Sequence, residues 1–116
     1  MATDAAVAAD GARVREALDR IVRCTVERLR PVKIILFGSR SKDQAHEASD
    51  IDILVIAESD LRPAQRSAAV ALACHPLGFP MDVIVRTPAE VDERLAMGDP
   101  FLAEILGEGQ VLYERP

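Results

Sequence analysis

Residues 35–56 read ILFGSRSKDQAHEASDIDILVI, two apolar blocks that enclose a polar segment. The first block stops at Gly38, and the second begins with Asp50 and Asp52, one residue apart. Short runs of aliphatic residues bounded by glycine and polar clusters are typical of buried strands. We therefore expect two core strands, the second of which carries two carboxylates at its start.

The rest of the chain alternates between helical and strand patterns. We expect helices over 11–30, 61–75, 87–97 and 99–107, and strands over 32–38, 50–57, 80–86 and 110–114. Residues 1–10 are rich in alanine and are expected to be frayed. Thr87 followed by Glu90 predicts a capping box, and Asp99 predicts a second helix cap. This order indicates a single α/β domain over 1–116, with a mixed β-sheet flanked by helices.

Two of the expected helices carry an apolar stripe that should face the sheet. In the first helix the stripe consists of Val14, Leu18, Ile21, Val22, Thr25 and Leu29. In the second helix it consists of Leu61, Ala64, Ala68, Ala71 and Leu72. The arginines of the first helix fall largely on its other side, which we interpret as a solvated face or, alternatively, as a partner surface.

The composition restricts the possible class of protein. A chain of 116 residues with 49% hydrophobic and 28% charged residues is typical of one globular domain. A net charge of -5 argues against general nucleic-acid binding, which needs clustered basic residues. No apolar run approaches the ~20 residues that span a bilayer, and the start lacks a secretory pattern. Cys24 and Cys74 show no metal-ligand spacing, so we expect free thiols in a cytoplasmic protein.

The paired aspartates suggest a cation site. Residues two apart on a strand face the same side, so the carboxylates of Asp50 and Asp52 should repel each other unless a cation lies between them. Asp82 lies in a third apolar strand and can join them if that strand pairs with the second. Carboxylates together with substrate phosphates suit Mg²⁺, and three carboxylates can hold two ions. In the plainer interpretation, Asp50 is a turn residue and Asp52 an exposed strand acid.

The end of the first strand suggests a complementary phosphate site. Gly38 permits close approach of a ligand to the backbone, and Ser39 is expected to open a short helix with its N–H groups and hydroxyl available. Arg40 adds positive charge. A phosphate site beside a metal site is the arrangement that phosphoryl or nucleotidyl transfer requires.

The segment GSRSKDQAHEASDID resembles the signature of the minimal nucleotidyltransferases in the polymerase-beta-like superfamily. That signature is Gly-Ser, ten intervening residues, Asp-x-Asp, and later a third Asp inside a hydrophobic strand. The resemblance implies a polymerase-beta-like nucleotidyltransferase fold in which Gly38 and Ser39 hold the triphosphate. It further implies that Asp50 and Asp52 bind Mg²⁺, and that Asp82 completes the metal site and assists deprotonation of an acceptor hydroxyl.

The same resemblance implies a partner and a reaction. Minimal members commonly act as the antitoxin of a helical HEPN toxin, transferring AMP from ATP to a tyrosine of that toxin. Two alternatives remain: an antitoxin that neutralises its partner by occlusion, and transfer to a small molecule such as an aminoglycoside. Nucleotide preference and assembly as a homo- or hetero-oligomer are open at this point, and no membrane association is expected.

Overall fold

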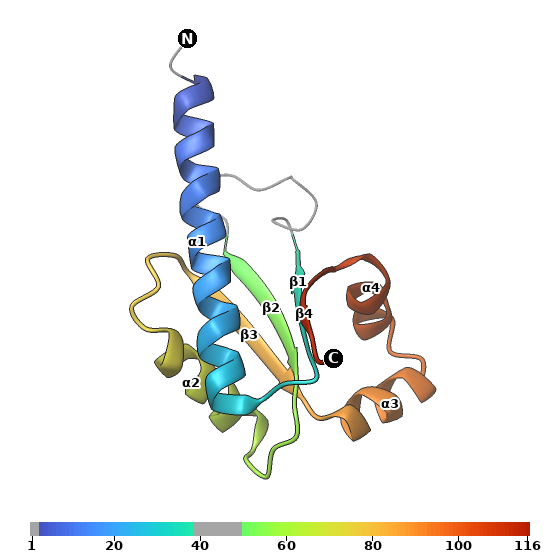
Figure 1. Ribbon diagram of the computed structural model, residues 1–116. Coiled ribbons are helices and arrows are strands. Elements are labelled where there is room, and N and C mark those ends of the chain that lie inside the picture. Colours follow the sequence, from blue (N-terminus) through green and yellow to red (C-terminus); the bar gives the residue numbers. More distant parts are fainter. Residues whose placement is uncertain (1–2, 39–49) are drawn as a thin grey trace.

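Four strands pair into one mixed sheet. They are β1 (Lys33–Phe37), β2 (Ile51–Ile56), β3 (Met81–Arg86) and β4 (Gln110–Glu114), in the spatial order β3-β2-β1-β4 (Figure 1). β1 pairs antiparallel with β2 and β4, whereas β2 and β3 run parallel. The computed structural model describes the backbone of residues 3–38 and 50–116 and the side chains of residues 11–38 and 50–116.

Two helices cover each face of the sheet. The described residues form α1 (Thr3–Leu29), α2 (Pro63–Cys74), α3 (Pro88–Ala96) and α4 (Pro100–Glu108). α1 and α2 lie on one face, and α3 and α4 lie on the other (Figure 1). The predicted α/β fold with a mixed sheet flanked by helices is therefore confirmed. Because β2 and β3 are parallel, the chain must cross over between them, and α2 forms that crossover.

The N-terminal prediction is wrong in one respect. The helix begins at Thr3 rather than at Gly11, and the expected fraying of residues 1–10 stays a prediction. Alanine is the strongest helix former, which accounts for a helix in this alanine-rich stretch. In Figure 1 this part of α1 extends past the end of the sheet. Within the described ranges, no helix is both long enough and apolar enough to span a membrane.

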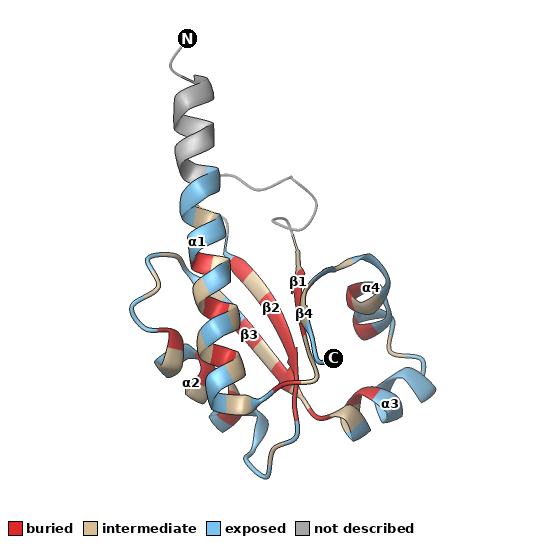
Figure 2. Ribbon diagram, in the orientation of Figure 1, coloured by how far each residue is buried: buried red, intermediate tan, exposed pale blue. Residues whose placement is uncertain are grey.

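The core has two layers because the residues of each strand alternate between the two faces of the sheet. On β2, Ile51, Ile53 and Val55 pack in the layer under α1 and α2, whereas Leu54 and Ile56 pack in the layer under α3 and α4. All five are buried. The ribbon of β2 is coloured as buried along most of its length (Figure 2). Both faces of this central strand are thus covered along most of its length. Only the residues at its start can carry polar side chains toward solvent.

The predicted apolar stripe of α2 is wrong. Leu61 and Leu72 are exposed, with 48% and 77% of their surface accessible, and the buried residues of α2 are Arg66, Val70 and Cys74. The buried face is set by the interaction partners of Arg66 rather than by hydrophobicity alone. Arg66 donates from Nε to the carbonyl oxygen of Leu61 at 2.7 Å and from Nη1 to Glu90 Oε1 at 2.6 Å.

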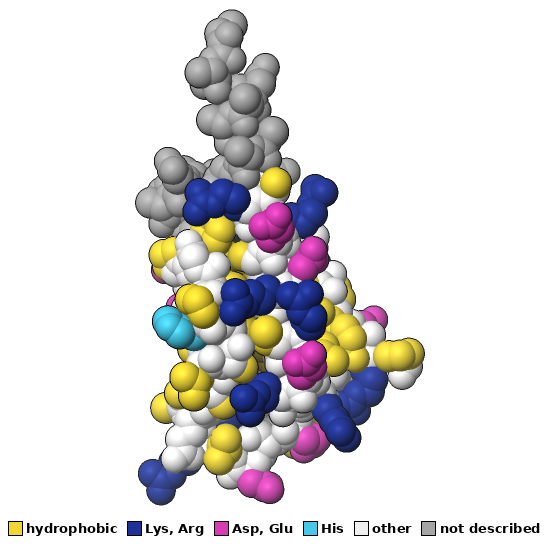
Figure 3. All heavy atoms as spheres, turned by 60° about the vertical axis from the view of Figure 1, so that its left-hand side comes forward, with side chains coloured by type: hydrophobic (Ala, Val, Ile, Leu, Met, Phe, Trp, Pro, Cys, Tyr) yellow, Lys and Arg dark blue, Asp and Glu magenta, His cyan; other side chains and the backbone are white. Residues whose placement is uncertain are grey.

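The charged side of α1 is mixed in sign. Figure 3 shows basic side chains interspersed with acidic and hydrophobic ones on this side of the molecule, without a continuous basic patch. Two of the arginines contact the loop that precedes β3. The Arg13 guanidinium lies 5.4 Å from the centre of the Phe79 ring, and Arg20 Nη2 donates to the carbonyl oxygen of His75 at 3.4 Å. These contacts support the interpretation of a largely solvated face, with two side chains that steady the loop.

A capping box joins α2 to α3 through one carboxylate. Glu90 accepts from the backbone N–H of Thr87 at 2.8 Å, and the Thr87 hydroxyl accepts from the Glu90 N–H at 3.2 Å, as predicted. The same carboxylate pairs with Arg66, whose side chain is only 8% exposed. The hydrogen bond from Arg66, followed by that from Thr87, lowers the pKa of Glu90 below its usual 4.5. The ionised form is therefore the one that stabilises this contact.

Replacing Glu90 by Gln is expected to destabilise the fold at pH 7 by about 1–2 kcal/mol, because the buried guanidinium loses its charged partner. A lowered pKa stabilises the fold above the usual value of 4.5, and this contribution is lost as the pH falls through the lowered pKa. Urea unfolding at pH 7 should therefore separate the two proteins, and at pH 3 the difference should shrink. Glu93→Gln, on the same helix, is the matched control. Equal stability of Glu90→Gln and the parent at pH 7 would contradict this account.

Candidate active site

The three predicted acidic residues lie at one end of the sheet. Asp52 and Asp82 are direct partners in the parallel pairing of β2 and β3, and Asp50 immediately precedes β2. Neighbouring strands are about 4.8 Å apart, so the two paired carboxylates start from adjacent backbone positions and leave the same face. This is the face that carries α3 and α4, whose buried residues lie mainly farther along the strands. The expected pairing of the second and third strands is confirmed.

The electrostatic environment of Asp52 is unfavourable to charge. Burial raises the pKa of Asp52 above its usual 3.8, and the nearby charges of Asp82 and then Asp50 raise it further. Asp52 is half-buried, whereas Asp50 and Asp82 are exposed. Within residues 11–38 and 50–116, no three His, Cys, Asp or Glu side chains are arranged closely enough to form a ready metal cluster. Like-charged carboxylates repel, so a cation is the natural means of drawing these three closer.

Gly38 makes room for the Asp52 carboxylate. A Cβ on Gly38 would overlap Asp52 Oδ2 and lie 3.3 Å from its Cγ. The backbone of Gly38 also has a φ of +76°, which side-chain-bearing residues rarely adopt. Only glycine therefore satisfies both the turn at the end of β1 and the packing against Asp52. Gly38, at the predicted end of the first strand, thus lies against Asp52, one of the two paired acids.

The start of β3, and with it Asp82, is positioned by the preceding loop. The backbone N–H of Ile51 donates to the carbonyl oxygen of Pro80 at 2.9 Å, which extends the β2–β3 pairing to the edge of the sheet. Arg13 and Arg20 contact the same loop from α1. Asp82 is thus held from two sides although its own side chain is exposed.

The donor atoms fit a hard divalent cation. Three carboxylates on one face supply only oxygen ligands, which Mg²⁺ prefers, and their mutual repulsion disfavours the arrangement without a positive charge. Asp50, Asp52 and Asp82 are the residues that would hold the metal, and this assignment stays a prediction. Ser39 and Arg40 lie outside the described residues, so their assignment to a phosphate site stays a prediction.

Sequence reasoning does not single out Phe37, which lies beside the acids. Phe37 pairs directly with Asp52 across β1 and β2, and its side chain packs on the same face. Its ring meets the ring of Phe101 from α4 edge to face, with centroids 5.8 Å apart. The alternation of β1 assigns Phe37 to the opposite face from Leu36, but only the tertiary contact with α4 reveals an aromatic wall.

Comparisons with known proteins bear on the family and the fold. Residues 18–111 match the model of the nucleotidyltransferase domain family. A crystal structure of a candidate nucleotidyltransferase from Sulfolobus solfataricus superposes with a TM-score of 0.60 at 20% sequence identity, covering 90% of this chain and 86% of that one. At this identity the structural likeness supports the fold alone. No curated protein matches the sequence significantly.

Gly38→Ala is expected to impair any activity that depends on Asp52. The new methyl group must displace the carboxylate, and a misplacement of about 1 Å costs roughly 100-fold in rate. Strain at positive φ should also lower the free energy of unfolding by about 1–2 kcal/mol. Gly98→Ala is the matched control, because Gly98 has a φ of +81° and nothing within 4 Å of an added Cβ. Activity lost equally in both variants would refute the specific role of the Gly38–Asp52 contact.

Asp52→Asn is expected to raise the melting temperature by a few degrees at pH 7 in buffer containing a metal chelator. The pKa of Asp52 is raised, so its ionisation destabilises the fold as the pH rises through that pKa. Below the usual pKa of 3.8 the Asp52 carboxyl is protonated and therefore neutral, like the Asn side chain. The gain in melting temperature should therefore disappear at pH 3. Thermal melts at the two pH values test this, with Asp92→Asn on α3 as control. A lower melting temperature for Asp52→Asn at pH 7 would contradict it.

Proposed function

The chain belongs to the nucleotidyltransferase domain family, and on that premise we propose that it transfers AMP from ATP to a protein hydroxyl. The proposed acceptor is a tyrosine of a HEPN-type toxin, so that the protein acts as the antitoxin of the pair. The observation that carries the nucleotidyl-transfer part is the register of Asp52 against Asp82, with Asp50 on the same side and Gly38 against Asp52. The toxin as acceptor rests on the sequence resemblance.

The proposed reaction is an in-line displacement. The acceptor oxygen forms a bond to the α-phosphorus, the bond from that phosphorus to the bridging oxygen breaks, and pyrophosphate leaves. Asp82, exposed at the side of the sheet away from Gly38, accepts the hydroxyl proton. Bound Mg²⁺ would neutralise the phosphate charge and orient the reacting oxygens. Asp50 and Asp52 would hold the Mg²⁺ ion in place, and Gly38 leaves room for the carboxylate of Asp52 at its position.

The exposure of the site suits a large acceptor. Asp50 and Asp82 are exposed, and the residues that α3 and α4 bury lie mainly farther along the strands. A hydroxyl carried on the surface of another protein can therefore approach Asp82 without a channel. This openness favours a protein acceptor over a small molecule, which enzymes usually enclose.

The test is transfer of label from α-labelled ATP to a HEPN-type partner in the presence of Mg²⁺. Asp50→Asn/Asp52→Asn should reduce the rate at least about 100-fold, equivalent to ~2.7 kcal/mol in the activation barrier. Asp92→Asn should transfer at the parental rate. Equal labelling by the double variant would rule out the assignment of these carboxylates.

A growth-rescue assay separates catalysis from occlusion. If transfer neutralises the partner, Asp50→Asn/Asp52→Asn should fail to protect cells that express it, although it still binds the partner. Protection equal to that of the parent protein would instead support neutralisation by occlusion.

A further inference from the structure

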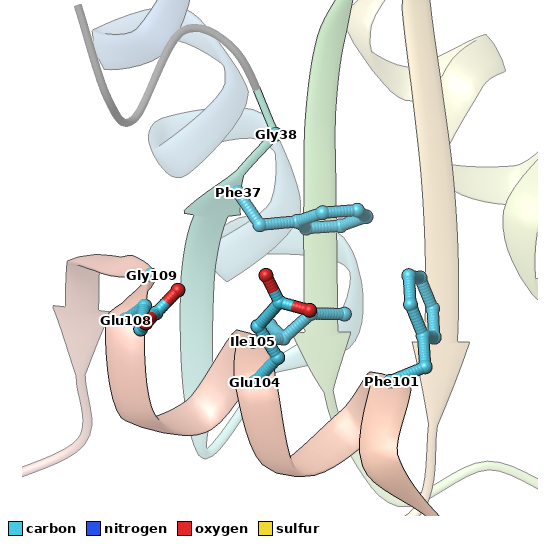
Figure 4. Close-up of a pocket in the computed structure, with 7 residues that line it drawn as sticks. All are labelled: Phe37, Gly38, Phe101, Glu104, Ile105, Glu108 and Gly109. Atoms are coloured by element: carbon cyan, nitrogen blue, oxygen red, sulfur yellow. The ribbon is translucent and has the colours of Figure 1, made fainter.

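A pocket of about 210 Å³ opens between the end of β1 and α4, directly beside the acidic residues. It is lined by Phe37, Gly38, Phe101, Glu104, Ile105, Glu108 and Gly109 (Figure 4). Gly38 therefore contacts both the pocket and the Asp52 carboxylate. A ligand that reaches from the acidic residues past Gly38 enters this pocket.

The pocket exists because α4 packs closely against β1 at Gly109. A Cβ on Gly109 would lie 2.5 Å from both Ile35 Cγ2 and the carbonyl oxygen of Ile105. The spacing of Phe101, Glu104 and Glu108 places the three on one side of α4. Figure 4 shows the two glutamates directed toward the β1 side of the cavity. The close contact at Gly109 thus aims this side of α4 at the end of β1.

The walls of the pocket suit a flat, neutral ring that carries hydrogen-bond donors. The Phe101 ring is 52% exposed and meets the Phe37 ring at an interplanar angle of 86°. Exposed aromatic rings of this kind stack on nucleobases, since every base has a flat π face. The carboxylates of Glu104 and Glu108 accept hydrogen bonds and repel phosphate. Each carboxylate has about four acceptor positions, so it can accept a hydrogen bond from a ligand while it keeps its protein partners.

The position of the pocket distinguishes the nucleotide from the acceptor. Asp82, Asp52 and Phe37 occupy neighbouring strands in one row across the sheet, because Asp52 is the direct partner of both of the others. The pocket lies on the Phe37 side of Asp52, next to Gly38, and Asp82 lies on the opposite side. An acceptor that approaches at Asp82 occupies one side of Asp52. The pocket on the other side is therefore available to the donor nucleotide.

We propose that this pocket binds the base of the donor nucleoside triphosphate, with Phe37 and Phe101 as its aromatic wall. Glu104 selects bases that carry an exocyclic amino group, namely adenine, cytosine and guanine, over uracil. An amino group donates two hydrogens to acceptors, whereas the only base-edge donor of uracil, N3–H, lies between two carbonyl oxygens that the carboxylate repels. This inference rests on the proposed nucleotidyl transfer and adds the residues that would choose the nucleotide.

The test uses a nucleotide that cannot be transferred, so that it does not depend on the reaction. α,β-Methylene-ATP and its uridine counterpart are titrated into the protein with Mg²⁺, and dissociation constants and NMR shifts of the Phe37 and Phe101 rings are measured. The adenine analogue should shift both ring signals and bind at least about fivefold more tightly than the uracil analogue. Glu104→Gln should remove most of this preference.

Variants identify the contribution of each wall. Phe101→Leu should weaken both analogues about tenfold, with Leu72→Ala on the exposed side of α2 as control, and Glu93→Gln is the control for Glu104→Gln. Unchanged ring signals, no measurable binding of either analogue, or parental preference in Glu104→Gln would each overturn the pocket assignment. Base-selective binding without transfer of label would leave the pocket assignment standing and refute the proposed reaction. Transfer of label that neither Phe101→Leu nor Glu104→Gln affects would support the proposed reaction and overturn the pocket assignment.

Discussion

The repulsion among Asp50, Asp52 and Asp82 is the constraint on which the rest of the structure depends. Two of these residues face each other across a parallel strand pair, and the pKa of Asp52 is raised by burial and by both neighbours. Asp50 and Asp52 lie at the start of β2 and Asp82 near the start of β3, so their repulsion opposes folding at this end of the sheet. On the function proposed above, a bound cation and phosphate chain would offset this repulsion.

The remaining structure accommodates this local cost without closing the site. Beyond Asp52, β2 is buried on both faces, with α1 and α2 on one side and α3 and α4 on the other. The ion pair of Arg66 with Glu90 ties the two helical layers together away from the acids. Gly38 and Gly109 each permit one close contact. A side chain on Gly38 would collide with Asp52, and a side chain on Gly109 would collide with β1. Both glycines border the pocket that we assign to the base.

Local patterns predicted much of this architecture, and tertiary contacts account for what they missed. The caps at Thr87 and Asp99 and the succession of helices and strands along the chain were predictable because they depend on neighbouring residues. The inward face of α2 was not, because Arg66 is buried by partners distant in sequence. The aromatic pocket was missed for the same reason: Phe101 meets Phe37 only after α4 folds back on β1. Spacing predicted the acids, whereas the roles of Ser39 and Arg40 depend on residues outside those described.

The central claim is that the three carboxylates form one divalent-cation site, and paramagnetic broadening by Mn²⁺ tests it most directly. The side-chain carboxyl signals of Asp50, Asp52 and Asp82 are followed by NMR while substoichiometric Mn²⁺ is added with a nucleoside triphosphate. Our account predicts that these three signals broaden first and together, that excess Mg²⁺ restores them, and that exposed acids such as Asp92 are unaffected. Broadening centred on other acids, or uniform weak broadening across the surface, would contradict it.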